Sequence, residues 1–247
     1  MKRWLAGIWL VGLLGSGAAT LGWQAHQAEA LSPQIQETRS TVSASLLGSL
    51  RRVIANFTWI SAYAAWERRD PAQTDVQVRA AVALAPETRF FWVNGARKMA
   101  YDFPRWEQLT FARQTGRAPT PAEVAALKAP HLTRAVAFLR EAETFLGPTP
   151  QLAIERAMIH LHAAGDRAAA ADAFHEAAQR PGAPYFAGRV YAELLRDLGR
   201  ATEALAWYTE TYPTLPVDEP SAARAVVAER IAQLRAELGL PPVALPE

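Results

Sequence analysis

A pattern of four residues recurs 34 positions further along the chain and constrains its fold more than any other feature. Gly165, Ala170, Phe174 and Ala177 recur as Gly199, Ala204, Tyr208 and Thr211, and the same displacement relates Gly182 to Pro216. Each unit places a glycine, which can adopt the left-handed conformation of a tight turn, before small and aromatic residues at helical spacing. One such unit cannot bury its apolar face alone. The pattern therefore predicts helical hairpins that stack on their neighbours.

Helical periodicity continues along most of the chain and is interrupted at intervals by proline and glycine. We expect breaks at Asp70-Pro71, Pro86, Pro104, Gly116 to Pro121, Gly147 to Pro150, Pro181 to Pro184 and Pro213 to Pro220. Alanine, a strong helix former, is abundant, and we find no alternating run of apolar and polar residues long enough for a strand. These observations predict an all-α fold.

The repeat resembles the tetratricopeptide repeat (TPR) family, whose units are 34-residue helical hairpins. Less regular matches extend it towards the N-terminus: Trp92, Gly95, Ala96 and Met99 resemble a first helix, and Ala135, Leu139 and Ala142 a second helix, preceded by a short helix disturbed by Pro119, Pro121 and Pro130. The resemblance implies an α-solenoid of TPR-like hairpins over residues 50–219. A C-terminal capping helix and tail would occupy residues 220–247, with an apolar stripe formed by Ala225, Val226, Ile231, Leu234 and Leu238.

The N-terminal segment predicts one transmembrane helix. Residues 4–25 contain no ionised side chain, and as a helix they would be about 33 Å long, close to the thickness of the hydrocarbon core of a bilayer. Lys2 and Arg3 precede this segment and Glu29 follows it, so the N-terminus is expected in the cytoplasm and the remainder outside it. This indicates a single-pass protein of a bacterial inner membrane with a periplasmic repeat domain.

A cleavable signal sequence is the alternative for residues 1–30. Ala28-Glu29-Ala30 has the small residues of a cleavage site, and cleavage after Ala30 would release the protein. Residues 31–49 are rich in serine and threonine and predict a stalk or linker, either as coil or as the first turns of the next helix.

Composition and motifs argue against several classes of function. Lysine and arginine number 26 against 24 aspartate and glutamate, and Lys2 and Arg3 account for the difference, so no positive field is expected to attract nucleic acid. The chain has no cysteine. His160 and His162 are two residues apart on a predicted helix and would point to nearly opposite sides, which disfavours a zinc site. We therefore expect no metal, no cofactor and no catalytic activity.

In the TPR family, the first helices of successive hairpins line a concave groove that receives a segment or helix of another protein. By this resemblance the partner-binding residues are Phe90, Arg97, Tyr101, Glu155, His162, Arg189, Glu193 and Arg196. Their mixed charge suits a polar peptide better than a strongly acidic tail. Trp59, Tyr63 and Trp66 would line the groove in one alignment and the core in another.

These features predict an interaction or assembly module for an envelope complex. One alternative is a cell-envelope enzyme acting on glycan or peptidoglycan, with Asn94, Arg97, Tyr101 and Asp102 as its site. Another is a passive structural subunit held in a membrane complex by its transmembrane helix. The oligomeric state and the identity of the partner stay open.

Overall fold

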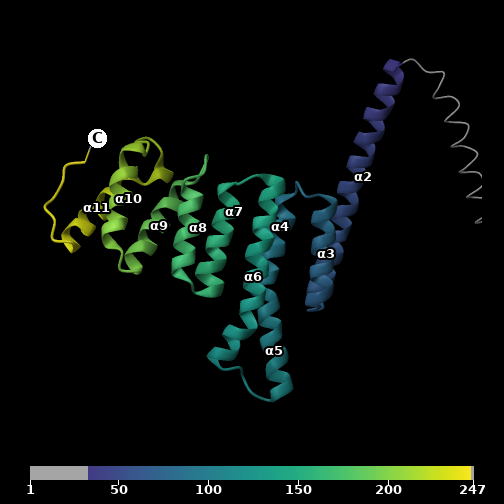
Figure 1. Ribbon diagram of the computed structural model, residues 1–247, viewed down its shortest axis with the longest axis horizontal. Helices are drawn as coiled ribbons and strands as arrows, with labels where there is room; N and C mark the ends of the chain where they lie inside the picture. The colour runs from purple at the N-terminus through teal and green to yellow at the C-terminus, as the bar shows by residue number, and fades with distance from the viewer. Residues whose placement is uncertain (1–32, 246–247) are drawn as a thin grey trace, which may run out of the picture. The chain divides into compact units, whose positions relative to one another are not determined.

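The computed structural model describes residues 33–245, which form helices and no strand (Figure 1). The chain divides into two compact units, Met1–Val53 and Ile54–Glu247. The expected transmembrane segment, residues 4–25, and the alternative cleavage site at Ala30 lie outside the described residues. Within the described part of the chain, no helix combines the length and the hydropathy needed to cross a bilayer.

The helices follow one another along the described part of the chain. Their bounds are α2 (Pro33–Glu67), α3 (Pro71–Leu84), α4 (Arg89–Arg97), α5 (Phe103–Thr115), α6 (Pro121–Leu146), α7 (Pro150–Met158), α8 (Arg167–Ala178), α9 (Tyr185–Asp197), α10 (Ala201–Thr211) and α11 (Arg224–Glu237). Between these helices lie two π-helical turns, η1 (Lys98–Asp102) and η2 (Ile159–Ala164), and two 3₁₀ turns, η3 (Tyr212–Thr214) and η4 (Pro220–Ala222). From α6 to α11, each α-helix packs against the next one in the chain. The predicted all-α class is confirmed.

The 34-residue pattern corresponds to two helical hairpins. Gly165 ends η2 before α8, and Gly199 separates α9 from α10, with left-handed φ values of 73° and 76°. Phe174 of α8 and Tyr208 of α10 are buried at equivalent positions, in two adjacent hydrophobic clusters. The glycines therefore form the turns, and the aromatic rings fill the space between helices.

The predicted helix break at Pro104 is wrong, and so is the short helix expected to be disturbed at Pro130, because both prolines are accommodated inside longer helical segments. Pro104 follows the π-turn η1, in which the Phe103 N–H donates to the Lys98 carbonyl five residues earlier, so that α4, η1 and α5 continue without a break. A π-turn widens the helix and relieves the clash of a proline ring with the preceding turn.

Pro130 lies inside α6, which runs unbroken over 26 residues instead of beginning as a short, disturbed helix. A capping box between Thr120 and Glu123 stabilises its first turn. Burial of Phe138 and Leu139 stabilises its second half. These interactions outweigh the single backbone hydrogen bond that Pro130 removes.

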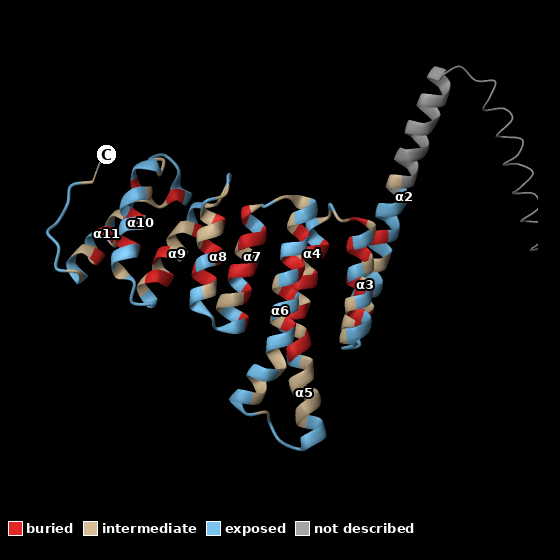
Figure 2. Ribbon diagram, in the orientation of Figure 1, coloured by how far each residue is buried: buried red, intermediate tan, exposed pale blue. Residues whose placement is uncertain are grey.

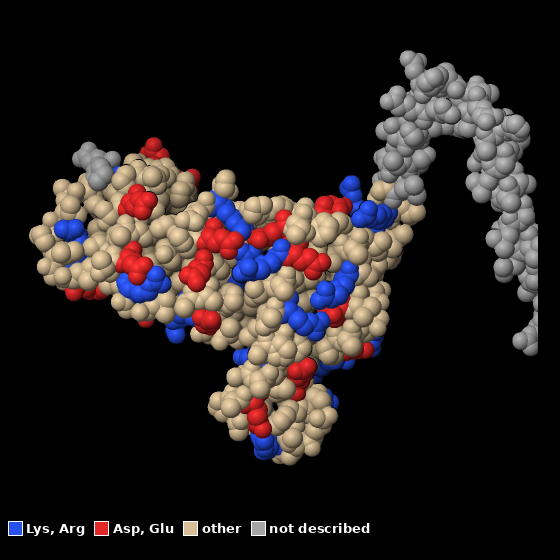
Figure 3. Space-filling model, in the orientation of Figure 1, with Lys and Arg blue, Asp and Glu red and all other residues tan. Residues whose placement is uncertain are grey.

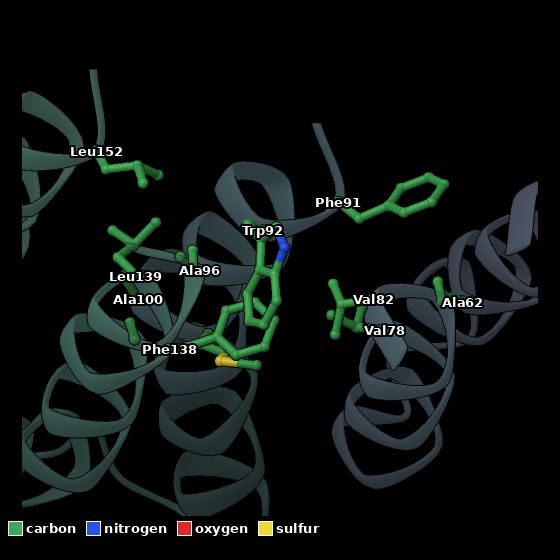
Figure 4. Close-up of a cluster of buried hydrophobic side chains, with 14 of the residues drawn as sticks. Ala62, Val78, Val82, Phe91, Trp92, Ala96, Ala100, Phe138, Leu139 and Leu152 are labelled. Carbon is green, nitrogen blue, oxygen red and sulfur yellow. The ribbon is translucent and has the colours of Figure 1, made fainter. Parts of the chain in front are cut away.

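The largest core cluster joins α2, α3, α4 and α6 around the indole of Trp92 (Figure 4). Trp92 and Phe138 have ring centroids 4.6 Å apart, and the Trp92 indole N–H donates to the Pro86 carbonyl at 2.8 Å. Gly95 allows α4 to approach closely, because a Cβ atom there would lie 2.6 Å from Val78 Cγ1. Figure 2 shows that α4, α6 and α7 each have a buried and an exposed side.

The C-terminal helix packs on α10 with Ile231, Leu234 and Leu238 of the predicted stripe, but its first turn differs from the prediction. Val227, Ile231 and Leu234 are buried, whereas Val226 is exposed. Ala223 adopts a left-handed conformation (φ 50°) between η4 and α11, and this turn sets where the helix begins and which of its sides meets α10. The predicted stripe containing Val226 is therefore corrected to one containing Val227.

Candidate interaction surface

Aromatic residues of α2 and α4 form the first part of the surface. Trp59 stacks on Phe91, with ring centroids 5.2 Å apart, and meets the edge of exposed Phe90 at 5.3 Å. Tyr63 and Trp66 lie further along α2, with centroids 5.1 Å apart. The two tryptophans are half-buried and Tyr63 is exposed, so these three residues fit neither the core nor the groove interpretation alone. They join the core to the surface.

The π-turn η1 brings a lysine and an aspartate against this aromatic group. The Lys98 Nζ lies 4.1 Å from the centroid of the Trp66 ring and 5.5 Å from that of Tyr63, both within range of a cation–π interaction. The Trp66 indole N–H donates to Asp102 Oδ2 at 2.6 Å. Burial lowers the pKa of Lys98, and the negative charge of Asp102 partly opposes this effect. Lys98 was not among the predicted site residues.

The next contacts join α4 and η1 to α7. The Arg97 guanidinium donates twice to Glu155, with 2.9 Å between Nε and Oε2 and 2.5 Å between Nη2 and Oε1. These hydrogen bonds raise the pKa of Arg97. The Tyr101 hydroxyl donates to the Met158 carbonyl at 3.2 Å, and partial burial raises the Tyr101 pKa. Three of the predicted partner-binding residues are therefore brought together, with the two charges paired to each other.

We call Tyr63, Phe90, Lys98, Tyr101 and Met158 the aromatic face. Tyr63, Phe90, Tyr101 and Met158 are all exposed, and the helical segments that carry them are α2, α4, η1 and α7. The contacts of Trp59, Trp66, Arg97 and Glu155 hold these elements together, and the Arg97 side chain is itself 53% exposed beside the face. Of the predicted residues, only Phe90 and Tyr101 present exposed apolar area on it.

The predicted residues of α9 form a separate group that is engaged by the C-terminal segment. Arg189 donates to the carbonyls of Ser221 and Ala222, both at 3.0 Å. Glu193 lies 3.0 Å from Arg230 of α11 and 3.6 Å from Arg196. The sequence did not predict these contacts with the C-terminal segment, because nothing in the repeat pattern indicates where α11 would pack. His162 lies exposed on η2, four residues after Met158 on the continuous α7–η2 segment.

A second polar feature, absent from the predicted site, lies across α6, α7 and α8. Arg156 of α7 is buried and donates to Glu143 at 2.6 Å and to Glu176 at 2.5 Å. Arg180 also binds both carboxylates. Figure 3 shows charged side chains of both signs gathered over these helices. An arginine within the apolar stripe of Leu152, Ala153 and Ala157 was the one signal in the sequence.

Two cavities lie outside the aromatic face. One, of about 550 Å³, lies between α6, η2 and α8 and is lined by Arg140, His160 and Asp172, among others. Burial lowers the pKa of His160 there. The other, of about 260 Å³, is lined by Tyr185, Trp207 and residues around them.

The residues of the alternative enzyme site make structural contacts. The Asn94 amide donates to the Phe90 carbonyl at 2.9 Å, and Asp102 accepts from Trp66. Neither cavity is lined by Asn94, Arg97, Tyr101 or Asp102. Among the described residues, no group of three or more histidine, aspartate or glutamate side chains is placed to hold a metal ion. Comparison with protein-family models and with curated proteins finds no match to this chain.

Proposed function

We propose that this protein is a membrane-anchored, TPR-like interaction module whose aromatic face binds a helix or an extended segment of a partner protein. The observation that carries this proposal is the set of exposed aromatic side chains on α2, α4 and η1, namely Tyr63, Phe90 and Tyr101. Exposed tyrosine and phenylalanine gathered on one surface are typical of protein interfaces, where they contribute much of the binding energy.

The Arg97–Glu155 ion pair beside the face refines the kind of partner. Arg97 and Glu155 already satisfy each other through two hydrogen bonds, so a partner gains little from pairing with either. What the face offers is apolar area with one cation, Lys98, positioned over aromatic rings. We therefore propose a partner segment with apolar side chains at helical or alternating spacing, rather than the polar peptide suggested by the sequence.

The fold proposal rests on the two related hairpins. α7–η2 with α8 and α9 with α10 repeat at a displacement of 34 residues, and each packs on the next. Continued through α3, α4 and α6, this arrangement is an α-solenoid with α11 as its cap. The proposal places this domain on the extracytoplasmic side of the inner membrane, tethered by residues 4–25.

Photo-crosslinking tests the proposal with a matched control. Phe90 and Phe145 are phenylalanines with the same exposed fraction, 55%, but Phe145 is on α6, outside the aromatic face. A photoreactive phenylalanine analogue is placed at each position in the full-length chain, expressed in its native cell. We expect Phe90 to form a discrete adduct with one protein and Phe145 to form none.

Substitution gives an independent test of the same surface. Phe90→Asp should abolish co-purification of that protein from native membranes, and Phe145→Asp should not. Equal adducts at both positions, or none at Phe90, would contradict an interaction at this face. Retained co-purification with Phe90→Asp would instead favour a passive subunit held by its membrane helix.

A further inference from the structure

Helix α2 has two apolar sides, and only one of them is packed. Ala55 and Ala62 are fully buried in the core cluster with Val78 and Ala81. Phe57 and Ile60 lie on the opposite side of the helix and are 65% and 61% exposed. Large apolar side chains exposed to this extent on a well-formed helix indicate a surface that is covered in the functional state.

The exposed side has the spacing of a coiled-coil seam. Leu50, Val53, Phe57, Ile60 and Ala64 follow one another at intervals of three, four, three and four residues, which makes them consecutive a and d positions of a heptad repeat. We call these five residues the outer stripe. The first four are among the exposed large hydrophobic residues. A helix that packs only on a globular core does not require a second row of apolar residues at this spacing.

The residues beside the outer stripe do not oppose association with an identical helix. The flanking e and g positions are Ile54, Ser61, Asn56 and Tyr63. None of these carries a charge at neutral pH, so identical stripes meet without repulsion. Ala55 and Ala62 occupy f positions, opposite the seam. The helices packed on α2 in the second unit therefore do not obstruct its outer side.

We propose that the outer stripe packs against the same stripe on neighbouring copies of this chain, in a parallel coiled coil. The chain continues for 32 residues before α2, through the apolar segment 4–25 that predicts a membrane anchor. The parallel arrangement rests on the proposed membrane anchor: copies tethered to one bilayer at the same end of the chain are expected to present their stripes in parallel and in register. At the other end of the second unit α11 covers α10, whereas no described element covers the outer stripe.

The size of the outer stripe sets the conditions under which it associates. Its exposed side chains and Ile54 offer about 100 Å² each, or on the order of 1,000 Å² for a pair of copies, the lower bound for a specific interface. Association in dilute solution should therefore be weak. Anchoring in a bilayer raises the effective concentration of each copy near its neighbours and makes the association efficient.

Cysteine crosslinking in vesicles tests the proposal, since the chain has no cysteine of its own. Full-length Leu50→Cys, Phe57→Cys and Ile60→Cys are reconstituted in phosphatidylcholine vesicles and oxidised. We expect a covalent dimer from each variant, because in a parallel seam every a or d residue meets its own copy. Val76→Cys on α3, a position that is 58% exposed, is the matched control and should remain monomeric.

The results separate the possible occupants of the stripe. Crosslinking at only one stripe position would indicate antiparallel helices and overturn the parallel arrangement. No crosslinking at any stripe position would mean that the stripe faces lipid or a different protein. Equal crosslinking of Val76→Cys would mean that the crosslinks arise from random collision. Either result overturns the proposal.

A charge variant provides the second measurement. Phe57→Glu combined with Ile60→Glu should convert the reconstituted protein to monomers, as measured by the mass of particles released in small lipid discs. Its helix content should be unchanged, because both side chains are exposed. Val76→Glu should remain associated. An oligomer that survives the double substitution would also overturn the proposal.

Discussion

Replacing Arg156 by methionine tests whether the buried charge network stabilises the packing of α6, α7 and α8. The Arg156 side chain is 3% exposed and donates to Glu143 and Glu176. Methionine keeps an unbranched apolar stem of similar reach, so the variant removes the charge and its hydrogen bonds without leaving a large cavity.

The expected cost follows from what each carboxylate retains. Removing one partner of a fully buried ion pair costs about 3–5 kcal/mol, because the other charge is left without compensation. Here Arg180 still binds both carboxylates, and Glu176 is 43% exposed to water. We therefore expect a smaller loss, about 2–3 kcal/mol in the free energy of unfolding.

Urea unfolding of the full-length protein in mild detergent, followed by circular dichroism at 222 nm, measures this loss. Arg117→Met is the control, because Arg117 also donates twice to one glutamate, Glu123, but in an exposed position. Its unfolding midpoint should not change within error. A loss below about 1 kcal/mol for Arg156→Met, or an equal loss for both variants, would refute the reasoning.

The same network predicts how stability depends on pH. Burial raises the pKa of Glu143, but the hydrogen bonds from Arg156 and Arg180 together outweigh it, so the pKa lies below its usual value of 4.5. A carboxyl group with a lowered pKa in the folded state stabilises the protein above about pH 4.5. That stabilisation is lost as the pH falls through the folded value. Arg156→Met should reduce this acid-dependent loss, and urea midpoints measured between pH 7 and pH 3 would detect it.

Three further predictions concern other parts of the described chain. Gly95→Ala should lower the free energy of unfolding by about 1–3 kcal/mol in urea titrations, despite the higher helix propensity of alanine. The added Cβ would lie 2.6 Å from Val78 and 2.9 Å from Phe138, and an unchanged unfolding midpoint would contradict this packing. Asp102→Asn should lower the pKa of Lys98 further, since the Asp102 carboxylate is the charge that raises it. NMR titration of the lysine side chain measures the shift, and a higher pKa would be inconsistent with an interaction between Lys98 and Asp102. Arg117→Gln should raise the pKa of Glu123 from about 2 towards 4.5 in a carboxyl NMR titration, because the hydrogen bond from Arg117 is the main cause of the lowered value. A pKa that stays near 2 would show that the hydrogen bonds from Thr120 alone are enough to lower it.

Much of the helical framework could be predicted from local sequence. Gly165 and Gly199 occupy the predicted turns, and Phe174 and Tyr208 the predicted buried positions, because turn conformation and helical spacing depend on near neighbours in the chain. The same local reasoning failed at Pro104 and Pro130. There a π-turn and the packing of α6 compensate for a lost hydrogen bond, and neither is visible in the local pattern.

The candidate surface was only partly predictable. Phe90 and Tyr101, two of the predicted partner-binding residues, are exposed, but the sequence could not show that Arg97 and Glu155, 58 residues apart, would pair with each other. Nor could it show that Arg189 and Glu193 would be engaged by the C-terminal segment, or that Lys98 would lie over Trp66.

The sequence by itself determined that this chain forms helices, where most of them turn, and which of their sides are apolar, because these properties follow from residue spacing along one helix. The tertiary structure decided which charges are paired, which aromatic rings stay exposed, and that α2 keeps a second apolar side open. The physical reason is that pairing and burial depend on residues brought together from distant parts of the chain. A shift of one residue along a helix, as between Val226 and Val227, changes which side chain contacts the neighbouring helix.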